Sequence, residues 1–228
     1  EFLPGYEPQA EKYETFGCTV WGSQNQIEIY FKKVFGFEPN FSERFNYILA
    51  GVTLAGANPQ NAYESIRKEG LINNELLPVP TTYEEFITPR PMEKKYLKEG
   101  QSWLKGYDFK HEWLKSPTQE QVKEGLRYSP IAVSVTAWIE ENGLYVDRGL
   151  PNTHWCVAYG HVEDERGIIL KIFDSYDHSQ KLLHPNHHIS VAKRILVKKN
   201  PIRKNWLWEI IESLVNFFAD ILRKALRK

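Results

Sequence analysis

Cysteine is scarce in this sequence, with only Cys18 and Cys156 among 228 residues. Two cysteines are too few for a scaffold held together by disulfides. A single disulfide between them and two free thiols are both compatible with the sequence, and we interpret Cys156 as a buried free thiol. Methionine is scarcer still: Met92 is the only one, and residue 1 is a glutamate. We therefore expect a processed product from which any signal peptide has already been removed.

The sequence also lacks net charge, internal repeats and low-complexity linkers. Lys plus Arg and Asp plus Glu both number 29, so nothing draws the chain toward nucleic acid, and we expect no nucleic-acid partner. Hydrophobic residues make up 42% and charged residues 25%, which is typical of a globular protein with a substantial core. Composition alone constrains the localisation only weakly.

The first half of the chain has helical patterns and the second half has strand patterns, which predicts an α+β protein with segregated elements. One helix is expected to begin at Cys18 and to end before Gly36. A second has Asn58 as its N-cap, Pro59 in its first turn and Gly70 just past its end. Residues 75–91 are expected to form a proline-rich loop with a short helix near residues 83–86.

Two further helices and four strands complete the expected elements. Residues 92–105 have a helical pattern, and Ser116 with Gln119 is interpreted as the capping box of a short helix. Residues 131–135 and 189–197 alternate as strands do. The apolar runs 154–161 and 168–174 flank a polar turn at residues 163–167, which predicts an antiparallel hairpin.

The hairpin places two polar residues at its open end. His154 begins one strand and Asp174 ends the next, so a turn centred on residues 164–165 sets them opposite each other, with Cβ atoms about 5 Å apart. A carboxylate beside an imidazole can orient the ring for acid–base catalysis. Taken alone, each residue is more often structural, His154 as a core histidine and Asp174 as a strand-end residue.

Cys18 is expected at the first turn of a helix, directly after Gly17. The unpaired N–H groups and the helix dipole at this position favour a thiolate, and an imidazolium at His154 would favour it further. The backbone N–H of Cys18 is a candidate oxyanion donor. A lone cysteine in an apolar stretch is usually just buried, so Cys18 indicates catalysis only in combination with His154 and Asp174.

Five segments stand out in chain order: Phe-Gly-Cys-Thr-Val-Trp-Gly-Ser (16–23) with Gln-Ile-Glu (26–28), residues 42–48, residues 58–72, Asn-Thr-His-Trp-Cys-Val-Ala-Tyr-Gly (152–160) and Phe-Asp-Ser-Tyr (173–176). Taken together, they resemble the papain-like cysteine peptidases, and the series looks closest to the divergent bacterial and phage-borne members. The first segment resembles the helix of the catalytic cysteine, and the second and third are similar to the segments that follow it. The fourth resembles the strand of the catalytic histidine, and the fifth stands in the place of the family's Asn-Ser-Trp element. The resemblance leaves localisation open among the bacterial cytoplasm, secretion and a phage particle.

The resemblance implies a two-subdomain papain-like fold over residues 1–200, with a helical half at about 16–128 and an antiparallel β half at about 129–200. It implies Cys18 as nucleophile, His154 as general base and acid, and Asp174 as the residue that orients the histidine. The expected reaction is peptide-bond hydrolysis through a thioester, with a peptide or protein as substrate and no metal or organic cofactor.

Three positions depart from the family pattern. Asp174 stands where the family usually has asparagine, and it can still accept the histidine N–H. Lys12 occupies the usual spacing of the oxyanion glutamine, so Gln9, the nearest upstream glutamine, is the candidate side-chain donor. Tyr176 replaces the tryptophan that shields the triad. These departures keep two alternatives open: a non-catalytic subunit of a larger assembly such as a phage particle, and a hydrolase that uses the same triad on another acyl or isopeptide bond.

Residues 201–228 are expected to add a separate amphipathic helix. The apolar stripe comprises Trp206, Leu207, Ile210, Ile211, Leu214, Phe217, Phe218, Ile221, Leu222 and Ala225. The acids Glu209, Glu212 and Asp220 argue against a membrane-spanning helix. Docking on its own domain, self-association or pairing with a partner, and lying on a membrane surface all fit this helix.

A histidine cluster is the remaining candidate. His184, His187 and His188 lie close together, but no cysteine or acid at ligand spacing accompanies them, so we interpret them as a polar loop without metal.

Overall fold

The computed structural model describes residues 2–6, 8–177, 180–201 and 215–216. Residues 1–198 form one compact unit, and residues 199–228 form a second unit. The predicted helix over residues 201–228 lies outside the described residues except for positions 201 and 215–216. Within the described part of the chain, no helix is both long and apolar enough to cross a membrane.

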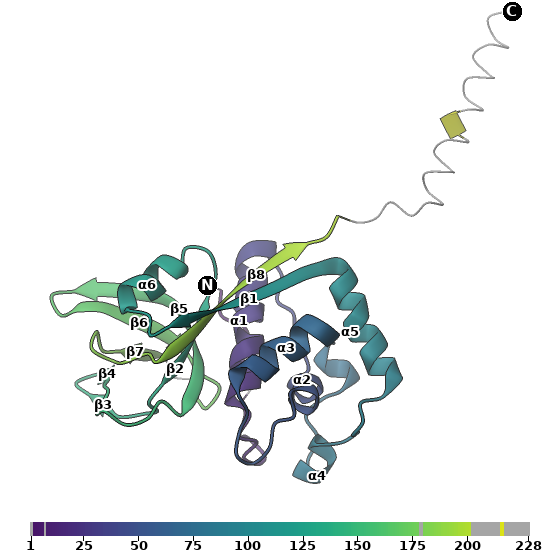
Figure 1. The fold of residues 1–228 in the computed structure, drawn as a ribbon, viewed down its shortest axis with the longest axis horizontal. Helices are drawn as coiled ribbons and strands as arrows, with labels where there is room; N and C mark the ends of the chain where they lie inside the picture. The colour runs from purple at the N-terminus through teal and green to yellow at the C-terminus, as the bar shows by residue number, and fades with distance from the viewer. Residues whose placement is uncertain (1, 7, 178–179, 202–214, 217–228) are drawn as a thin grey trace, which may run out of the picture. The chain divides into compact units, whose positions relative to one another are not determined.

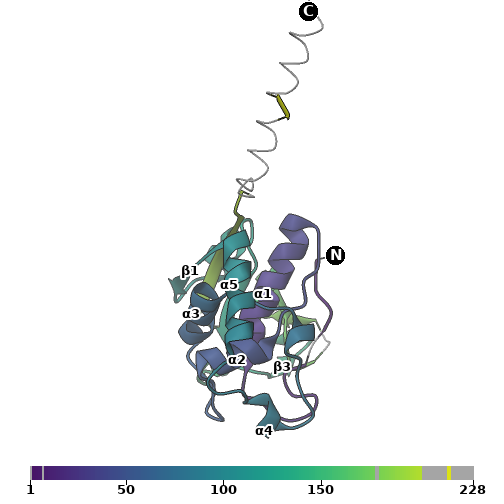
Figure 2. The ribbon, with the colours of Figure 1, turned by 90° about the vertical axis from the view of Figure 1, so that its right-hand side faces the viewer.

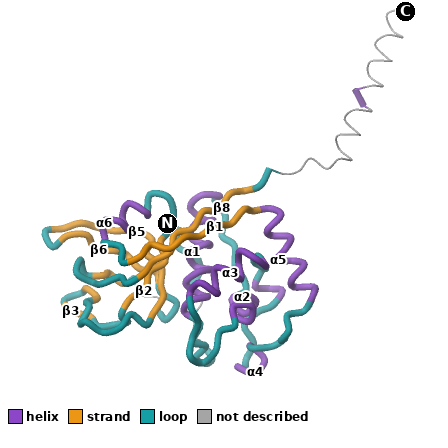
Figure 3. Tube along the Cα trace, in the orientation of Figure 1, coloured by secondary structure: helices purple, strands orange, loops and turns teal. Residues whose placement is uncertain are grey.

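Helices dominate the first half of the compact unit, and Figures 1 and 3 show α1 to α5 gathered on one side of the strands, while α6 lies beside β5 and β6. They are α1 (Cys18–Phe35), α2 (Glu43–Ala50), α3 (Pro59–Glu69), the 3-10 turn η1 (Asn74–Leu76), α4 (Tyr83–Phe86), α5 (Lys94–Gly106) and α6 (Gln119–Gly125). Figure 2 looks onto the helical half and shows α2, α3 and α5 grouped around α1.

The strands form one sheet in the order β1-β8-β2-β5-β6-β7-β4-β3. Their bounds are β1 (Tyr107–Lys115), β2 (Ile131–Val135), β3 (Glu140–Glu141), β4 (Leu144–Tyr145), β5 (His154–Asp164), β6 (Gly167–Phe173), β7 (Lys181–Leu183) and β8 (Val191–Lys199). β5 pairs antiparallel with both β2 and β6, so the strand that begins at His154 is central in the sheet.

Helix α1 is packed between the helical half and the sheet, and every residue from Thr19 to Phe31 is buried. Its contact with β5 is close because Gly22 has no side chain: a Cβ there would lie 2.8 Å from the Trp155 ring. One core cluster joins α1 and α3 to the sheet, a second fills the β half, and two smaller ones lie in the helical half. The packing fixes the start of α1 against the start of β5.

Most of the expected elements are confirmed with shifted ends. α1 begins at Cys18 and ends at Phe35, with Gly36 as a left-handed C-cap, and α3 has the predicted Asn58 cap. The predicted capping box at Ser116 is wrong: Thr118 caps α6 with Gln121, two residues later. The strand β1 was not predicted, although Phe109 points inward between exposed Asp108 and Lys110 with the alternation that strands show.

The hairpin is confirmed, but its predicted register is wrong. Asp164 pairs with Gly167, so only two residues make the turn. A bulge between Ala158 and Gly160 then shifts the pairing, and Val157 lies opposite Phe173. His154 and Asp174 are therefore diagonal neighbours beyond the last paired residues. Side chains two positions apart along a strand share a face, so both still project to the same side of the sheet.

Candidate active site

Cys18 is the first residue of α1 and is partly exposed. The N–H groups of Val20 and Trp21 both donate to the carbonyl of Gly17, which closes the first turn directly at the sulfur-bearing residue. Gly17 is required there, because a Cβ at this position would lie 2.5 Å from the Trp21 ring. The local backbone thus presents the Cys18 thiol at the N-terminus of a long buried helix.

His154 is the first residue of β5, and only 5% of its surface is exposed. Its Nε2 lies 2.6 Å from Oδ1 of Asp174. The ring also hydrogen-bonds with the side chain of Cys18. Because Nε2 faces the carboxylate, Nδ1 is the ring nitrogen left for the sulfur. The structure therefore brings Cys18, His154 and Asp174 together, as the sequence predicted.

Asp174 follows β6 directly and is fully buried. While Oδ1 faces His154, Oδ2 accepts a hydrogen bond of 2.8 Å from the indole N–H of Trp138 and lies 3.0 Å from Nζ of Lys181. Both carboxylate oxygens are therefore held, and the carboxylate cannot rotate without losing a charged or hydrogen-bonded partner.

Two aromatic rings lie beside the imidazole. The Trp138 ring is 5.6 Å from the His154 ring in an edge-to-face arrangement, and the Tyr176 ring is 5.0 Å away. The Tyr176 hydroxyl donates to Oε2 of Glu14, in the segment that leads to Cys18. The sequence pointed to Tyr176 in place of a shielding tryptophan, and the structure adds Trp138 from a different part of the chain.

The electrostatic surroundings favour the charged form of both His154 and Asp174. Burial is the largest influence on His154 and disfavours its imidazolium, but the hydrogen bonds and charges of Asp174 and Cys18 outweigh it and raise the pKa of His154 to about 9. Burial likewise raises the pKa of Asp174, yet His154 and Lys181 together bring that pKa below its usual value. At neutral pH the pair is therefore an imidazolium beside a carboxylate.

Gln9 lies on the segment that precedes Cys18 and is 2% exposed. Its Oε1 accepts a 2.7 Å hydrogen bond from the Ser175 hydroxyl, and its backbone N–H donates to the Ser175 carbonyl. Its Nε2 makes a longer contact of 3.5 Å with Glu14. Lys12, at the family's usual glutamine spacing, instead reaches the carbonyls of Val79 and Pro80.

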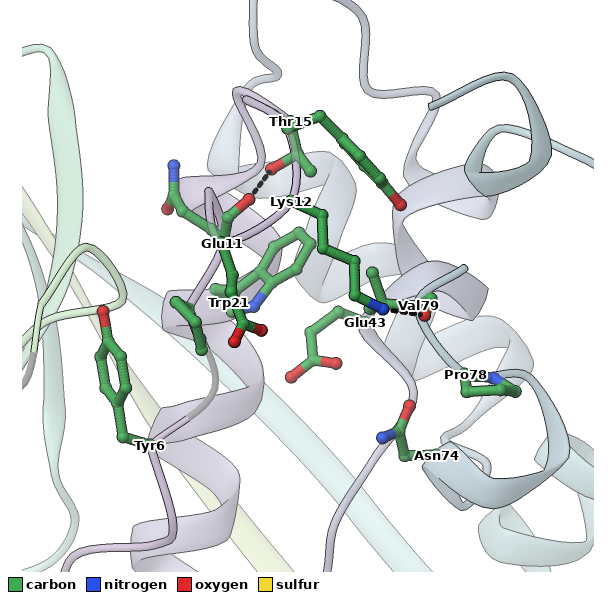
Figure 4. A pocket seen from close by; sticks show the side chains of 12 residues that line it. Tyr6, Glu11, Lys12, Thr15, Trp21, Glu43, Asn74, Pro78 and Val79 are labelled. Atoms are coloured by element: carbon green, nitrogen blue, oxygen red, sulfur yellow. Dashed lines mark hydrogen bonds between the residues drawn. The ribbon is translucent and has the colours of Figure 1, made fainter. Parts of the chain in front are cut away.

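A pocket of about 360 Å³ adjoins this segment on the side of the helical half. Gln9 and Thr15 line it from the segment before Cys18, and Trp21 lines it from α1. Figure 4 shows Lys12 and Glu43 extending into the same space, so the pocket carries charges of both signs. It offers room for a polar side chain next to the start of α1.

The other candidates have structural surroundings. Both cysteines are free, and burial raises the pKa of the Cys156 thiol well above its usual value, so this sulfur is held as an unreactive thiol. In the histidine cluster, His184 Nδ1 accepts the Asn186 N–H and His187 Nδ1 contacts the Tyr145 carbonyl. Among the described residues, no three His, Cys, Asp or Glu side chains gather as a metal ion would need.

Sequence reasoning missed Trp138 and Lys181. Trp138 lies 36 residues before Asp174, in a stretch without a recognisable motif. Lys181 is the first residue of a short apolar strand, where a lysine ordinarily points to solvent. The only available signal was that Lys181 opens an otherwise apolar Lys-Leu-Leu run close to Asp174.

Comparison with known proteins finds similarity at the level of structure alone. No described protein family matches the sequence, and no curated protein does. The bromelain protease from Ananas comosus, solved with an inhibitor, has a TM-score of 0.65 at 14% identity over 87% of this chain and 95% of its own. A clostridial cysteine protease after propeptide cleavage has a TM-score of 0.67 at 11% identity over 88% of this chain and 56% of its own.

The digestive procathepsin L 3 of Tenebrio molitor larval midgut has a TM-score of 0.62 at 13% identity, over 85% of this chain and 66% of its own. The chain thus spans less than two thirds of the clostridial and the insect protein. These similarities show that residues of both halves adopt the papain-like fold, with an N-terminal helical part and an antiparallel sheet, as predicted.

Proposed function

We propose that this chain is a cysteine peptidase that hydrolyses peptide bonds in a peptide or protein substrate. One observation carries the proposal: His154 hydrogen-bonds with Asp174 at 2.6 Å and with Cys18 at the first turn of α1. A thiol, an imidazole and a carboxylate in this order are what nucleophilic acyl transfer needs. The papain-like fold, in which cysteine proteases from three kinds of organism are known, supports the same conclusion.

The reaction begins with the Cys18 sulfur as a thiolate paired with the His154 imidazolium. The sulfur attacks the peptide carbonyl carbon, a C–S bond forms, and the carbonyl oxygen becomes an oxyanion. As the C–N bond breaks, His154 gives its proton to the departing amine, which leaves a thioester. His154, now neutral, then takes a proton from water, whose oxygen attacks the thioester and releases the acid. Cys18 leaves as thiolate and the cycle closes.

Asp174 keeps the imidazole in position through both steps. Because its Oδ1 holds Nε2, the ring cannot turn away when its other nitrogen loses a proton. The raised pKa of His154, about 9, means that the proton for the leaving amine is already on the ring at neutral pH. Proton transfer therefore needs no prior uptake from solvent.

Two N–H groups are our candidates for stabilising the oxyanion. The first is the backbone N–H of Cys18, which has no partner inside the helix because it belongs to the first turn. The second is the side-chain amide of Gln9. The Ser175 hydroxyl fixes the Oε1 end of that amide, and Nε2 carries two hydrogens, of which the contact with Glu14 uses one.

Selective alkylation tests the proposal. Iodoacetamide followed by peptide mass spectrometry should label Cys18 at neutral pH far faster than Cys156, and the Cys18→Ala variant should lose all hydrolysis of a fluorogenic peptide library. The Cys156→Ala variant is the matched control, because it removes the buried thiol and leaves the site in place.

Other outcomes identify the alternatives. Rapid labelling of Cys18 with no turnover of any peptide would reject a peptidase and favour a hydrolase of another acyl bond, such as an isopeptide. Slow labelling of Cys18 in the folded protein, together with no turnover, would favour a non-catalytic subunit with this fold.

A further inference from the structure

Lys181 is a lysine inside the β half. It begins β7, where it lies opposite Ile172 of β6, and its side chain is 1% exposed. A fully buried ammonium group loses its hydration and is tolerated only when it is paired and hydrogen-bonded. Lys181 therefore needs strong local compensation, and the position of that compensation is informative.

The ammonium group lies between two carboxylates and two aromatic rings. Its Nζ is 3.0 Å from Oδ2 of Asp174 and 2.7 Å from Oδ1 of Asp177. The same atom lies 5.2 Å from the centre of the Trp138 ring and 5.9 Å from that of Tyr145. Trp138 also donates to Oδ2 of Asp174, so Lys181 and Trp138 hold the same carboxylate oxygen.

These contacts divide the Asp174 carboxylate into two halves with separate partners. Oδ2 faces the cation and the indole, while Oδ1 faces the imidazole. An asparagine, which the resemblance led us to expect here, would need no counter-ion because its amide is neutral. An aspartate at this buried position carries a full negative charge. Without Lys181, only a protonated His154 would balance that charge, and no cation would balance it once His154 has given its proton to the leaving amine.

We propose that Lys181 is a positioning residue that allows an aspartate to take the place of asparagine in the site. It balances the charge of the Asp174 carboxylate at Oδ2 and holds Oδ1 toward His154. This inference rests on the proposed function of the site. With Lys181 in place, Asp174 can orient the imidazole of His154 and still favour the imidazolium less strongly than a carboxylate without a counter-ion would.

The groups that influence His154 come from several elements. Cys18 and Asp174 act on the ring directly, and Tyr176 lies beside it with Glu14 on its hydroxyl. The titratable groups around Asp174 and its partner Lys181 are Tyr6, Cys156 and Asp177. Within this set Lys181 is the cation besides the imidazolium itself. Its removal takes away a positive charge and frees the negative charge of Asp174, and both changes favour the protonated form of His154.

The test uses Lys181→Met and, as a matched control, Lys171→Met on the neighbouring strand β6. For Lys181→Met we expect kcat on a fluorogenic peptide to fall about 10- to 100-fold at pH 7, and the alkaline limb of the pH–rate profile to move upward by at least half a pH unit. NMR titration of the His154 ring should give a higher pKa than in the wild type. Lys171→Met should change neither quantity.

Asp174→Asn/Lys181→Met supplies the second arm. Since a neutral amide needs no counter-ion, this double variant should recover most of the folding stability that Lys181→Met loses. If Lys181→Met does not fold, the double variant still tests the idea, because a double variant that is equally unfolded would overturn it.

The results separate the inference from the proposed function. An active wild type whose Lys181→Met variant keeps an unchanged pH profile and an unchanged His154 titration would overturn the role of Lys181 alone. A wild type without hydrolytic activity would overturn the proposed function, and the NMR titration would still decide whether Lys181 acts on His154 through Asp174.

Discussion

The substitution Asp174→Asn measures how strongly the negative charge of Asp174 raises the pKa of His154. The substitution keeps the shape of the side chain and an oxygen that can accept the Nε2 hydrogen, but it removes the negative charge. We would make it in a Cys18→Ala background, so that no reactive thiol titrates alongside the histidine. Burial of His154, which disfavours the imidazolium, is unchanged by the substitution.

The magnitude follows from the structure. A rise in the pKa of His154 from 6.5 to about 9 corresponds to about 3 kcal/mol in favour of the imidazolium, at about 1.4 kcal/mol for each pKa unit. This value is the net effect that remains after burial has lowered the pKa, and Asp174 shares the opposing contribution with Cys18. Losing more than one pKa unit would cost upward of about 1.4 kcal/mol.

The sign of the pH dependence differs for the two partners. His154 has a raised pKa, so its contribution to folding stability is fully present below about pH 6.5 and is lost as the pH rises toward 9. Asp174 has a lowered pKa, so its contribution is present above about pH 3.8 and is lost as the pH falls below that value. The stability difference between aspartate and asparagine should therefore be largest from about pH 4 to 6.5 and should decline on both sides.

Urea unfolding at pH 3, 5, 7 and 9.5 measures this difference, with Cys18→Ala as the reference for Cys18→Ala/Asp174→Asn. An NMR titration of the His154 ring in both proteins gives the pKa directly. A stability difference that is independent of pH, or that grows between pH 6.5 and 9, would refute the reasoning.

Three further outcomes are expected. Gly17→Ala should lower the unfolding free energy by about 1–3 kcal/mol in urea titrations, because its Cβ would lie 2.5 Å from the Trp21 ring. Gly106→Ala is the control, because a Cβ there has no neighbour within 4 Å and should leave the stability unchanged. Equal stabilities of the two variants would contradict the packing argument. Gln9→Leu should lower kcat about 100-fold and leave the alkylation rate of Cys18 unchanged, and an unaltered kcat would remove Gln9 from the oxyanion site. Cys156→Ala should leave the labelling of Cys18 unchanged while costing about 1 kcal/mol of stability, and slower labelling would show that the buried thiol matters to the site.

Local signals in the sequence determined much of the architecture. Glycines and caps act within a few residues, so the start of α1 at Cys18 and its end at Gly36 were readable directly. The Asn58-Pro59 start of α3 and the hairpin of β5 and β6 were equally local. The papain-like fold followed from the order of these elements together with the resemblance.

The site itself was predictable only in part. The juxtaposition of Cys18, His154 and Asp174 was predictable because a helix start and a strand pair constrain where their side chains point. Their meeting did not depend on the assumed register, since the observed shift of the hairpin left His154 and Asp174 on the same face.

Contacts between distant segments were decided by the tertiary structure alone. Nothing local to Trp138 indicates that its indole N–H reaches Asp174, and nothing local to Lys181 indicates burial. Lys181 is buried because β7 lies between β6 and β4, and Trp138, from the segment between β2 and β3, packs against Tyr145 of β4. The amino-acid pattern determined which groups could do chemistry, whereas long-range packing decided which cation balances the carboxylate, because burial and charge pairing are properties of the assembled core and of no single segment.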